Sequence, residues 1–134
     1  MIQRILIVED EPLVAFDNEH LLQDAGYEVV ATVDSLAAAS EVIEAEELDL
    51  VLTDIKLNGE GDGTDVARAA RAREVPVLFV TAHPAEQAQG LALGCLAKPY
   101  SEKVLKGALD ALETHLQGKP LKKLPPQLTL YEVA

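Results

Sequence analysis

The sequence predicts an α/β domain in which a five-stranded parallel sheet is covered by helices on both faces. Short apolar runs of strand length lie at 5–8, 29–31, 50–53, 77–80 and 95–97, without the polar alternation of a half-solvated sheet. Stretches with the apolar spacing of helices follow them, at 12–25, 35–46, 64–73, 84–93 and 101–117. This alternation is typical of a doubly wound sheet with the strand order 2-1-3-4-5.

The composition limits the class of protein. With 134 residues, 49% of them apolar, the chain has enough material for one packed domain. A net charge of -12 argues against nucleic acids or anionic membranes as partners and favours a divalent cation. No apolar run approaches the roughly 20 residues of a membrane helix, and the N-terminus does not resemble a signal peptide, so we expect a cytoplasmic protein.

The end of the chain departs from the strand–helix alternation. We expect the domain to occupy residues 1–117, because Ser101 can cap the last helix and Gly118 can end it. Residues 118–134 contain three prolines and form a C-terminal tail. Two interpretations stay open: a flexible tail, or a segment that docks on the domain or on a partner, since several of its residues are apolar.

The polar residues that follow the strands indicate where function resides. In a doubly wound sheet, ligands bind beyond the carboxyl ends of the strands, where the strand order reverses. Five side chains of this sequence are expected at that edge: Glu9, Asp10, Asp54, Thr81 and Lys98. We therefore expect them to form one site.

The chemistry of this set favours a metal and a phosphoryl group. Three carboxylates repel one another unless a counter-charge is present, and oxygen ligands of this kind suit Mg²⁺. Lys98 can pair with a carboxylate or with a phosphoryl oxygen. Taken singly, these residues have simpler explanations. The acids could be present because acidic side chains stabilise the start of a helix, here at Pro12, and Lys98 could be a solvated surface group.

Together, these residues resemble the receiver domain of two-component response regulators. The pattern reads Glu9-Asp10, then Asp54, then Thr81-Ala82, then Lys98-Pro99-Tyr100, each after its strand, and the likeness covers residues 1–117. The resemblance implies a flavodoxin-like (receiver) fold. It also implies a single-domain response regulator that passes its signal on by binding a partner protein rather than acting as an enzyme.

The resemblance assigns a role to each residue. Asp54 would accept the phosphoryl group from a histidine kinase or a histidine phosphotransfer protein. Asp10, Asp54, the backbone carbonyl of Lys56 and, through water, Glu9 would hold Mg²⁺. Lys98 would pair with the phosphoryl group and Thr81 would swing toward it. The downstream partner would then bind the face made by the fourth helix, the fifth strand and the fifth helix.

Three positions depart from the usual pattern of this family, and the first is Glu9, because the acidic pair reads Glu-Asp rather than Asp-Asp. Cys95 replaces the aromatic residue three positions before the lysine, so the coupling to the partner surface must differ. Asn58 stands where a proline is usual, and Lys56 and His83 occupy positions that tend to tune the phosphoryl lifetime. The run 76–84 resembles receivers of the general stress response of alphaproteobacteria.

Other functions of this fold fit less well. A phosphatase of the haloacid dehalogenase class needs a second Asp two residues after its nucleophile, and Lys56 stands there. A flavodoxin would place the FMN phosphate against Glu9 and Asp10, which repel it. The remaining alternative is a receiver-fold binding module that works without phosphorylation.

Overall fold

The computed structural model describes residues 2–57, 59–81, 92–98, 100–119, 124 and 127–130. Within them, the sheet contains five parallel strands: β1 (Arg4–Val8), β2 (Glu28–Val33), β3 (Leu50–Thr53), β4 (Val77–Thr81) and β5 (Gly94–Ala97). Four helices connect or follow them: α1 (Pro12–Asp24), α2 (Leu36–Ala45), α3 (Gly63–Ala72) and α4 (Glu102–Leu116). The first five strands follow the predicted order β2-β1-β3-β4-β5.

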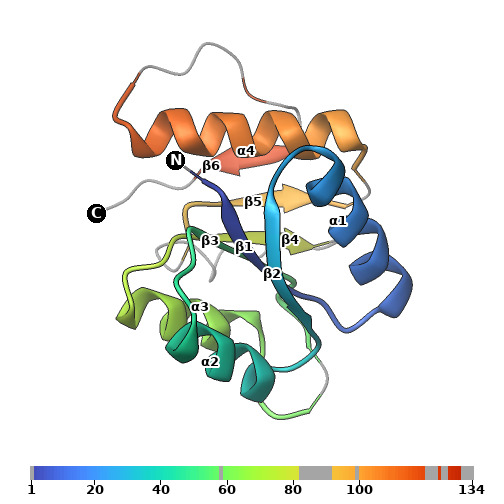
Figure 1. Ribbon diagram of the computed structural model, residues 1–134, viewed down its shortest axis with the longest axis vertical. Helices are drawn as coiled ribbons and strands as arrows, with labels where there is room; N and C mark the ends of the chain where they lie inside the picture. The colour runs from blue at the N-terminus through green and yellow to red at the C-terminus, as the bar shows by residue number, and fades with distance from the viewer. Residues whose placement is uncertain are drawn as a thin grey trace.

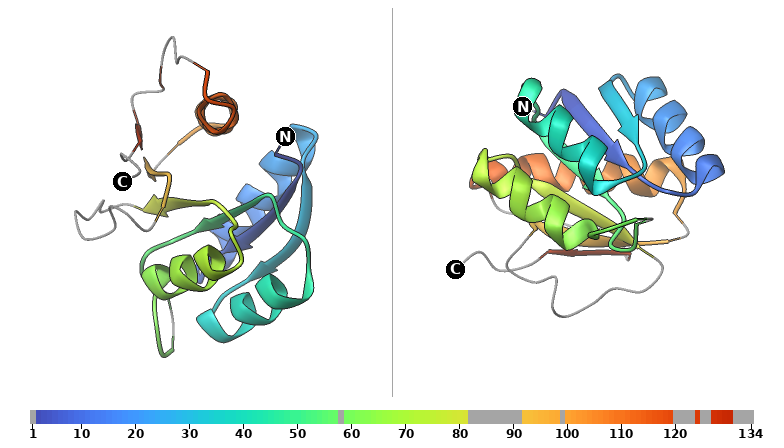
Figure 2. Two further views of the ribbon diagram at one scale, coloured as in Figure 1. Left: turned by 90° about the vertical axis from the view of Figure 1, so that its left-hand side faces the viewer. Right: turned by 90° about the horizontal axis from the view of Figure 1, so that it is seen from below.

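The helices cover both faces of the sheet, as Figures 1 and 2 show. Alternate residues of β1 separate two cores: Ile5 and Ile7 pack with α1 and α4, whereas Leu6 and Val8 pack with α2 and α3. The central strands β3 and β4 are buried along their whole length. This burial on both faces explains why their sequences are continuous apolar runs.

The helix predicted at 84–93 falls mostly outside the described residues. Its last two positions, Ala92 and Leu93, are described and are not helical. Instead, the Leu93 N–H donates to the Val77 carbonyl at 2.8 Å, which leads the chain directly into β5. No described helix is long and apolar enough to cross a lipid bilayer.

The sheet has a sixth strand that the five-stranded prediction missed. This strand, β6 (Leu128–Leu130), pairs antiparallel with β5 and forms the edge of the sheet beyond it. Leu128 is buried in the core under α4, so this part of the tail packs on the domain. The sequence did not predict β6, because the strand has only three residues and so short a segment does not show the two-residue repeat of a strand.

Gly94 allows this pairing. A Cβ atom at that position would overlap the carbonyl oxygen of Thr129, which faces it across the β5–β6 pair. Any larger residue must therefore push β6 away from β5.

We predict that Gly94→Ala weakens the β5–β6 pairing and leaves the other strands intact. In hydrogen–deuterium exchange, the amides of residues 128–130 should exchange faster, while those of β1, β3 and β4 keep their protection. Thr129→Ala is the matched control, because Thr129 is exposed and its backbone pairing does not depend on its side chain. Unchanged exchange at 128–130 in Gly94→Ala would contradict the prediction.

Candidate functional site

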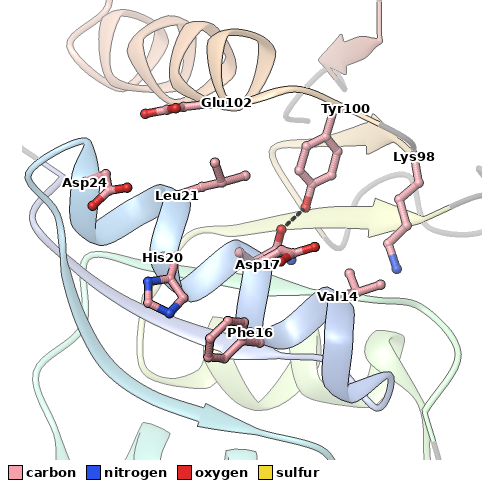
Figure 3. A pocket seen from close by; sticks show the side chains of 10 residues that line it. Val14, Phe16, Asp17, His20, Leu21, Asp24, Lys98, Tyr100 and Glu102 are labelled. Atoms are coloured by element: carbon pink, nitrogen blue, oxygen red, sulfur yellow. Dashed lines mark hydrogen bonds between the residues drawn. The ribbon is translucent and has the colours of Figure 1, made fainter.

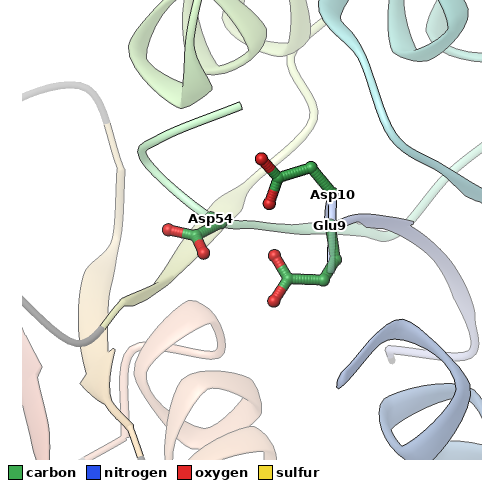
Figure 4. Close-up of side chains that lie close together, drawn as sticks. All are labelled: Glu9, Asp10 and Asp54. Carbon is green, nitrogen blue, oxygen red and sulfur yellow. The ribbon is translucent and has the colours of Figure 1, made fainter. Parts of the chain in front are cut away.

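The predicted residues meet at the carboxyl edge of the sheet. Glu9 and Asp10 follow β1, Asp54 follows β3, and one carboxylate oxygen from each lies within 4.8 Å of the others (Figure 4). The register of the parallel strands produces this meeting, because Val8 at the end of β1 pairs with Thr53 at the end of β3. The Asp54 N–H donates to the Val8 carbonyl at 3.0 Å, which continues the pairing into the site.

Lys98 binds two of the three acids. Its Nζ donates to Glu9 Oε1 at 2.6 Å and to Asp54 Oδ2 at 2.9 Å, and its side chain is 15% exposed. Burial by itself would lower the pKa of Lys98, but the hydrogen bonds to Glu9 and Asp54 outweigh it, so the net pKa is raised. Lys98 is therefore a permanent cation between two carboxylates.

Glu9 is the most deeply placed of the acids, with a side chain that has no exposed surface. Burial raises the pKa of Glu9 to about 7, although the hydrogen bond from Lys98 opposes this shift. Its second oxygen, Oε2, is buried without a hydrogen-bond partner among the described groups. An unpaired buried carboxylate oxygen is unfavourable, so this atom fits a position that accepts a cation.

A path from solvent leads to these acids. A hollow of about 390 Å³ opens beside Glu9 and Asp10 and is bounded by Pro12, Thr32 and Asp34. Asp10 is half-buried, whereas Glu9 and Asp54 are buried. A hydrated divalent ion can therefore reach the acids and keep part of its water, as Mg²⁺ prefers.

Asp54 is held by the chain that follows it. The Lys56 N–H faces Asp54 Oδ1 at 3.4 Å, so the turn after β3 curls back over the carboxylate. The Gly63 N–H then donates to the Ile55 carbonyl at 2.6 Å. A Cβ atom at Gly63 would overlap the Asp54 carbonyl oxygen, which explains why a glycine begins α3.

Thr81 lies next to Lys98 across the β4–β5 pair. It is the last residue of β4 and is 4% exposed, and its carbonyl accepts the Lys98 N–H at 2.9 Å. This backbone hydrogen bond places Thr81 and Lys98 next to each other, on the same side of β3, the strand that Asp54 follows. Three other residues that the sequence singled out, Asn58, His83 and Pro99, lie outside the described part of the chain.

A second polar pair adjoins the site and was not predicted. The Tyr100 hydroxyl donates to Asn18 Oδ1 of α1 at 2.7 Å, and burial raises the pKa of Tyr100 to about 12. Asn18 is 3% exposed in the middle of a helix. In the sequence, Asn18 is a polar residue on the core-facing side of a helix, and that clue could have drawn attention to this pair.

A groove runs along α1 beside this pair, with a volume of about 890 Å³ (Figure 3). Lys98 and Tyr100 line the end nearest the site, and side chains of α1 together with Glu102 of α4 line the rest. Two large apolar residues of α1 are exposed: Phe16, which lines the groove, is 60% exposed, and Leu13, one turn earlier on the helix, is 80% exposed. Exposed large apolar residues in one place indicate a surface that binds another protein.

Comparison with known proteins identifies the family. A family model described as the response regulator receiver domain matches residues 5–110. This chain belongs to the response regulator receiver family. Members of this family accept phosphoryl groups and are not hydrolases of the haloacid dehalogenase class.

The relatives are longer proteins. The sensory transduction protein RegX3 of Mycobacterium tuberculosis is 40% identical over 114 residues, which are 81% of this chain and 49% of RegX3. The phyllosphere-induced regulator PhyR of Methylorubrum extorquens is 37% identical over 86 residues, 63% of this chain and 32% of PhyR. The chain thus spans half or less of these curated relatives, and its description as a stand-alone receiver stays a prediction.

A solved structure with a bound metal is also similar. The receiver domain of the sensor histidine kinase PA1611 from Pseudomonas aeruginosa aligns with a TM-score of 0.69 at 31% identity. The alignment covers 79% of this chain and 93% of that domain. That domain has a magnesium ion coordinated in its active-site cleft. The expectation of an acidic pocket suited to Mg²⁺ agrees with this similarity.

The raised pKa of Glu9 predicts how stability depends on pH when divalent ions are absent. A carboxyl group whose pKa rises from 4.5 to about 7 on folding binds its proton more tightly in the folded state. The free energy of unfolding should therefore fall as pH increases between those values, by roughly 1–3 kcal/mol from this group. Urea unfolding in a chelating buffer measures this change, and Glu9→Gln should remove it. Parallel curves for the two proteins would contradict the prediction.

Proposed function

We propose that this receiver accepts a phosphoryl group on Asp54 from a histidine kinase or a histidine phosphotransfer protein, with Mg²⁺ bound, and passes the signal on by protein binding. The observation that best supports this is the Lys98 ammonium, which contacts Asp54 inside a cluster of acids at the strand-order reversal. A lysine in this position stabilises negative charge that arrives on Asp54.

Each residue of the site has a step to perform. The Asp54 carboxylate attacks the phosphorus atom, and the P–N bond of the donor breaks as the P–O bond forms. Lys98 then moves from the Asp54 oxygen to a phosphoryl oxygen, because the carboxyl oxygens of an acyl phosphate are weaker acceptors than those of a carboxylate anion. The Thr81 hydroxyl, at the end of the neighbouring strand, donates to another phosphoryl oxygen.

Glu9, Asp10, Asp54 and the backbone carbonyl of Lys56 are the groups proposed to hold the metal. When bound, Mg²⁺ supplies positive charge that neutralises the phosphoryl oxygens during transfer. Two observations support this assignment: Glu9 Oε2 is buried without a hydrogen-bond partner in the described part of the chain, and a solvent-facing hollow lies beside Asp10.

The donor is proposed to bind the groove along α1. Exposed acidic side chains form its rim, apolar side chains also line it, and one end lies at Lys98. The apolar residues are Val14, Phe16 and Leu21, and the acidic ones are Asp17, Asp24 and Glu102. A helical donor with an apolar stripe flanked by basic side chains complements this surface. The downstream partner is proposed to bind the face made by β5, α4 and the predicted helix at 84–93, which lies mostly outside the described residues. Strand β6 pairs with the edge of β5.

Phosphorylation is tested with a small donor that needs no docking surface. With acetyl phosphate and Mg²⁺, intact-mass measurement should find one phosphoryl group per chain, and none when a chelator removes the metal. Asp54→Asn should not be labelled, whereas Glu44→Gln, an exposed change on α2, should be labelled fully. Labelling of Asp54→Asn would contradict the proposal, and an unlabelled wild-type protein would favour the phosphorylation-independent binding module.

Docking of the donor is tested by reversing charges on the groove. A phosphotransfer profile against purified histidine kinases and phosphotransfer proteins first identifies a donor. Asp17→Lys combined with Asp24→Lys should then slow transfer from that donor by about tenfold or more, because the acidic rim steers a basic partner. Labelling by acetyl phosphate should not change. Glu41→Lys with Glu44→Lys on α2 is the matched control, and an equal loss in the control would refute docking on α1.

A further inference from the structure

We propose that Tyr100 and Asn18 couple the phosphorylation state of Asp54 to helix α1, so that the donor groove responds to the phosphoryl group it has helped to deliver. This inference rests on the proposed phosphorylation of Asp54. It makes Tyr100 and Asn18 positioning residues, which do not touch the reacting atoms but fix the shape of a surface according to the state of the site.

The first step of the coupling lies at Lys98. Its ammonium is held by Glu9 and Asp54 at 2.6 Å and 2.9 Å, so its position depends directly on the chemical state of Asp54. Tyr100 is only two residues further along the chain, and both side chains line the same end of the groove. We infer that movement of the Lys98 charge toward a phosphoryl oxygen acts on Tyr100, because both side chains line the groove and the Lys98 ammonium acts electrostatically on the Tyr100 hydroxyl.

The second step is the hydrogen bond between Tyr100 and Asn18. The hydroxyl and Oδ1 are 2.7 Å apart (dashed in Figure 3), and Asn18 is 3% exposed. The Nδ2 atom of Asn18 is buried and has no hydrogen-bond partner among the described groups. Among the described groups, the Asn18 side-chain amide is therefore held only through its oxygen, and its position depends on where the Tyr100 hydroxyl lies.

Helix α1 carries the movement to the surface. Val14 and Leu21 lie four residues before and three residues after Asn18, so all three share one face of the helix. Both flanking residues line the groove. A shift or release of Asn18 therefore changes the position of that face relative to α4, and with it the shape of the groove.

The local structure of β5 makes a different route necessary in this chain. Cys95 stands where receivers usually have an aromatic residue. It is 1% exposed and packs in the core layer beneath α2 and α3. Beyond it, β6 pairs with the edge of β5, with Cys95 opposite Thr129. No large ring is present at this position to rotate between buried and exposed states. The ring that follows Lys98, in contrast, contacts α1 directly.

The experiment uses a phosphoryl mimic and resolves single residues. Isotope-labelled full chain is titrated with Mg²⁺ and beryllofluoride, and ¹⁹F spectra verify that the mimic is bound. In the wild-type protein, we expect amide shifts around Asp54 and Thr81 and also along α1 at residues 14–21. Tyr100→Phe keeps the ring and removes the hydroxyl, so the shifts at the site should persist and those on α1 should be lost. Asn18→Ala and the double variant should give that same loss.

Tyr27→Phe is the matched control, since Tyr27 also packs on the core near α1 and should leave every shift intact. Full α1 shifts in Tyr100→Phe would overturn the coupling. Loss of mimic binding in Tyr100→Phe would also overturn it, because Tyr100 would then act within the site. A wild-type protein that binds no mimic would instead refute the phosphorylation proposal itself.

Discussion

The ion pairs of Lys98 with Glu9 and Asp54 are the interaction on which the arrangement of this receiver depends. The ends of three strands meet there: Glu9 follows β1, Asp54 follows β3 and Lys98 follows β5. Because the carboxylates are buried, they would destabilise the fold if the ammonium were removed. The same residues thus link the fold to the site. The register of the strands brings the three side chains together, and their charges must balance for that register to be stable.

Much of the surrounding structure follows from that constraint. The turn after β3 must curl tightly for Asp54 to face Lys98, and Gly63 permits this because no side chain fits against the Asp54 carbonyl. Asp62 then caps α3 by accepting the Thr64 N–H at 2.8 Å, which fixes the far end of the turn. Tyr100 binds Asn18 of α1, and Lys98 and Tyr100 both line the groove, so the groove adjoins the site.

The sequence was sufficient for the order of the first five strands and for the residues that meet at their ends. Both depend on apolar runs and on the rule that parallel strands end at a common edge, which are local and general properties. It was insufficient for β6, where only three residues pair and the evidence lies in Gly94 on another strand. The Tyr100–Asn18 bond also escaped prediction, because its partners are 82 residues apart and Asn18 belongs to no recognised motif. The site roles themselves stay predictions until they are measured.

The charge of the site explains why a divalent ion and a phosphoryl group belong together here. When all four groups are ionised, Glu9, Asp10, Asp54 and Lys98 leave two negative charges in a largely buried place. A phosphoryl group brings further negative charge and would be repelled by such a site. Protonation of Glu9, whose pKa burial raises, relieves part of that excess in the metal-free state. A divalent cation removes it fully, so the same ion that stabilises the acids also makes the approach of a phosphodonor electrostatically feasible.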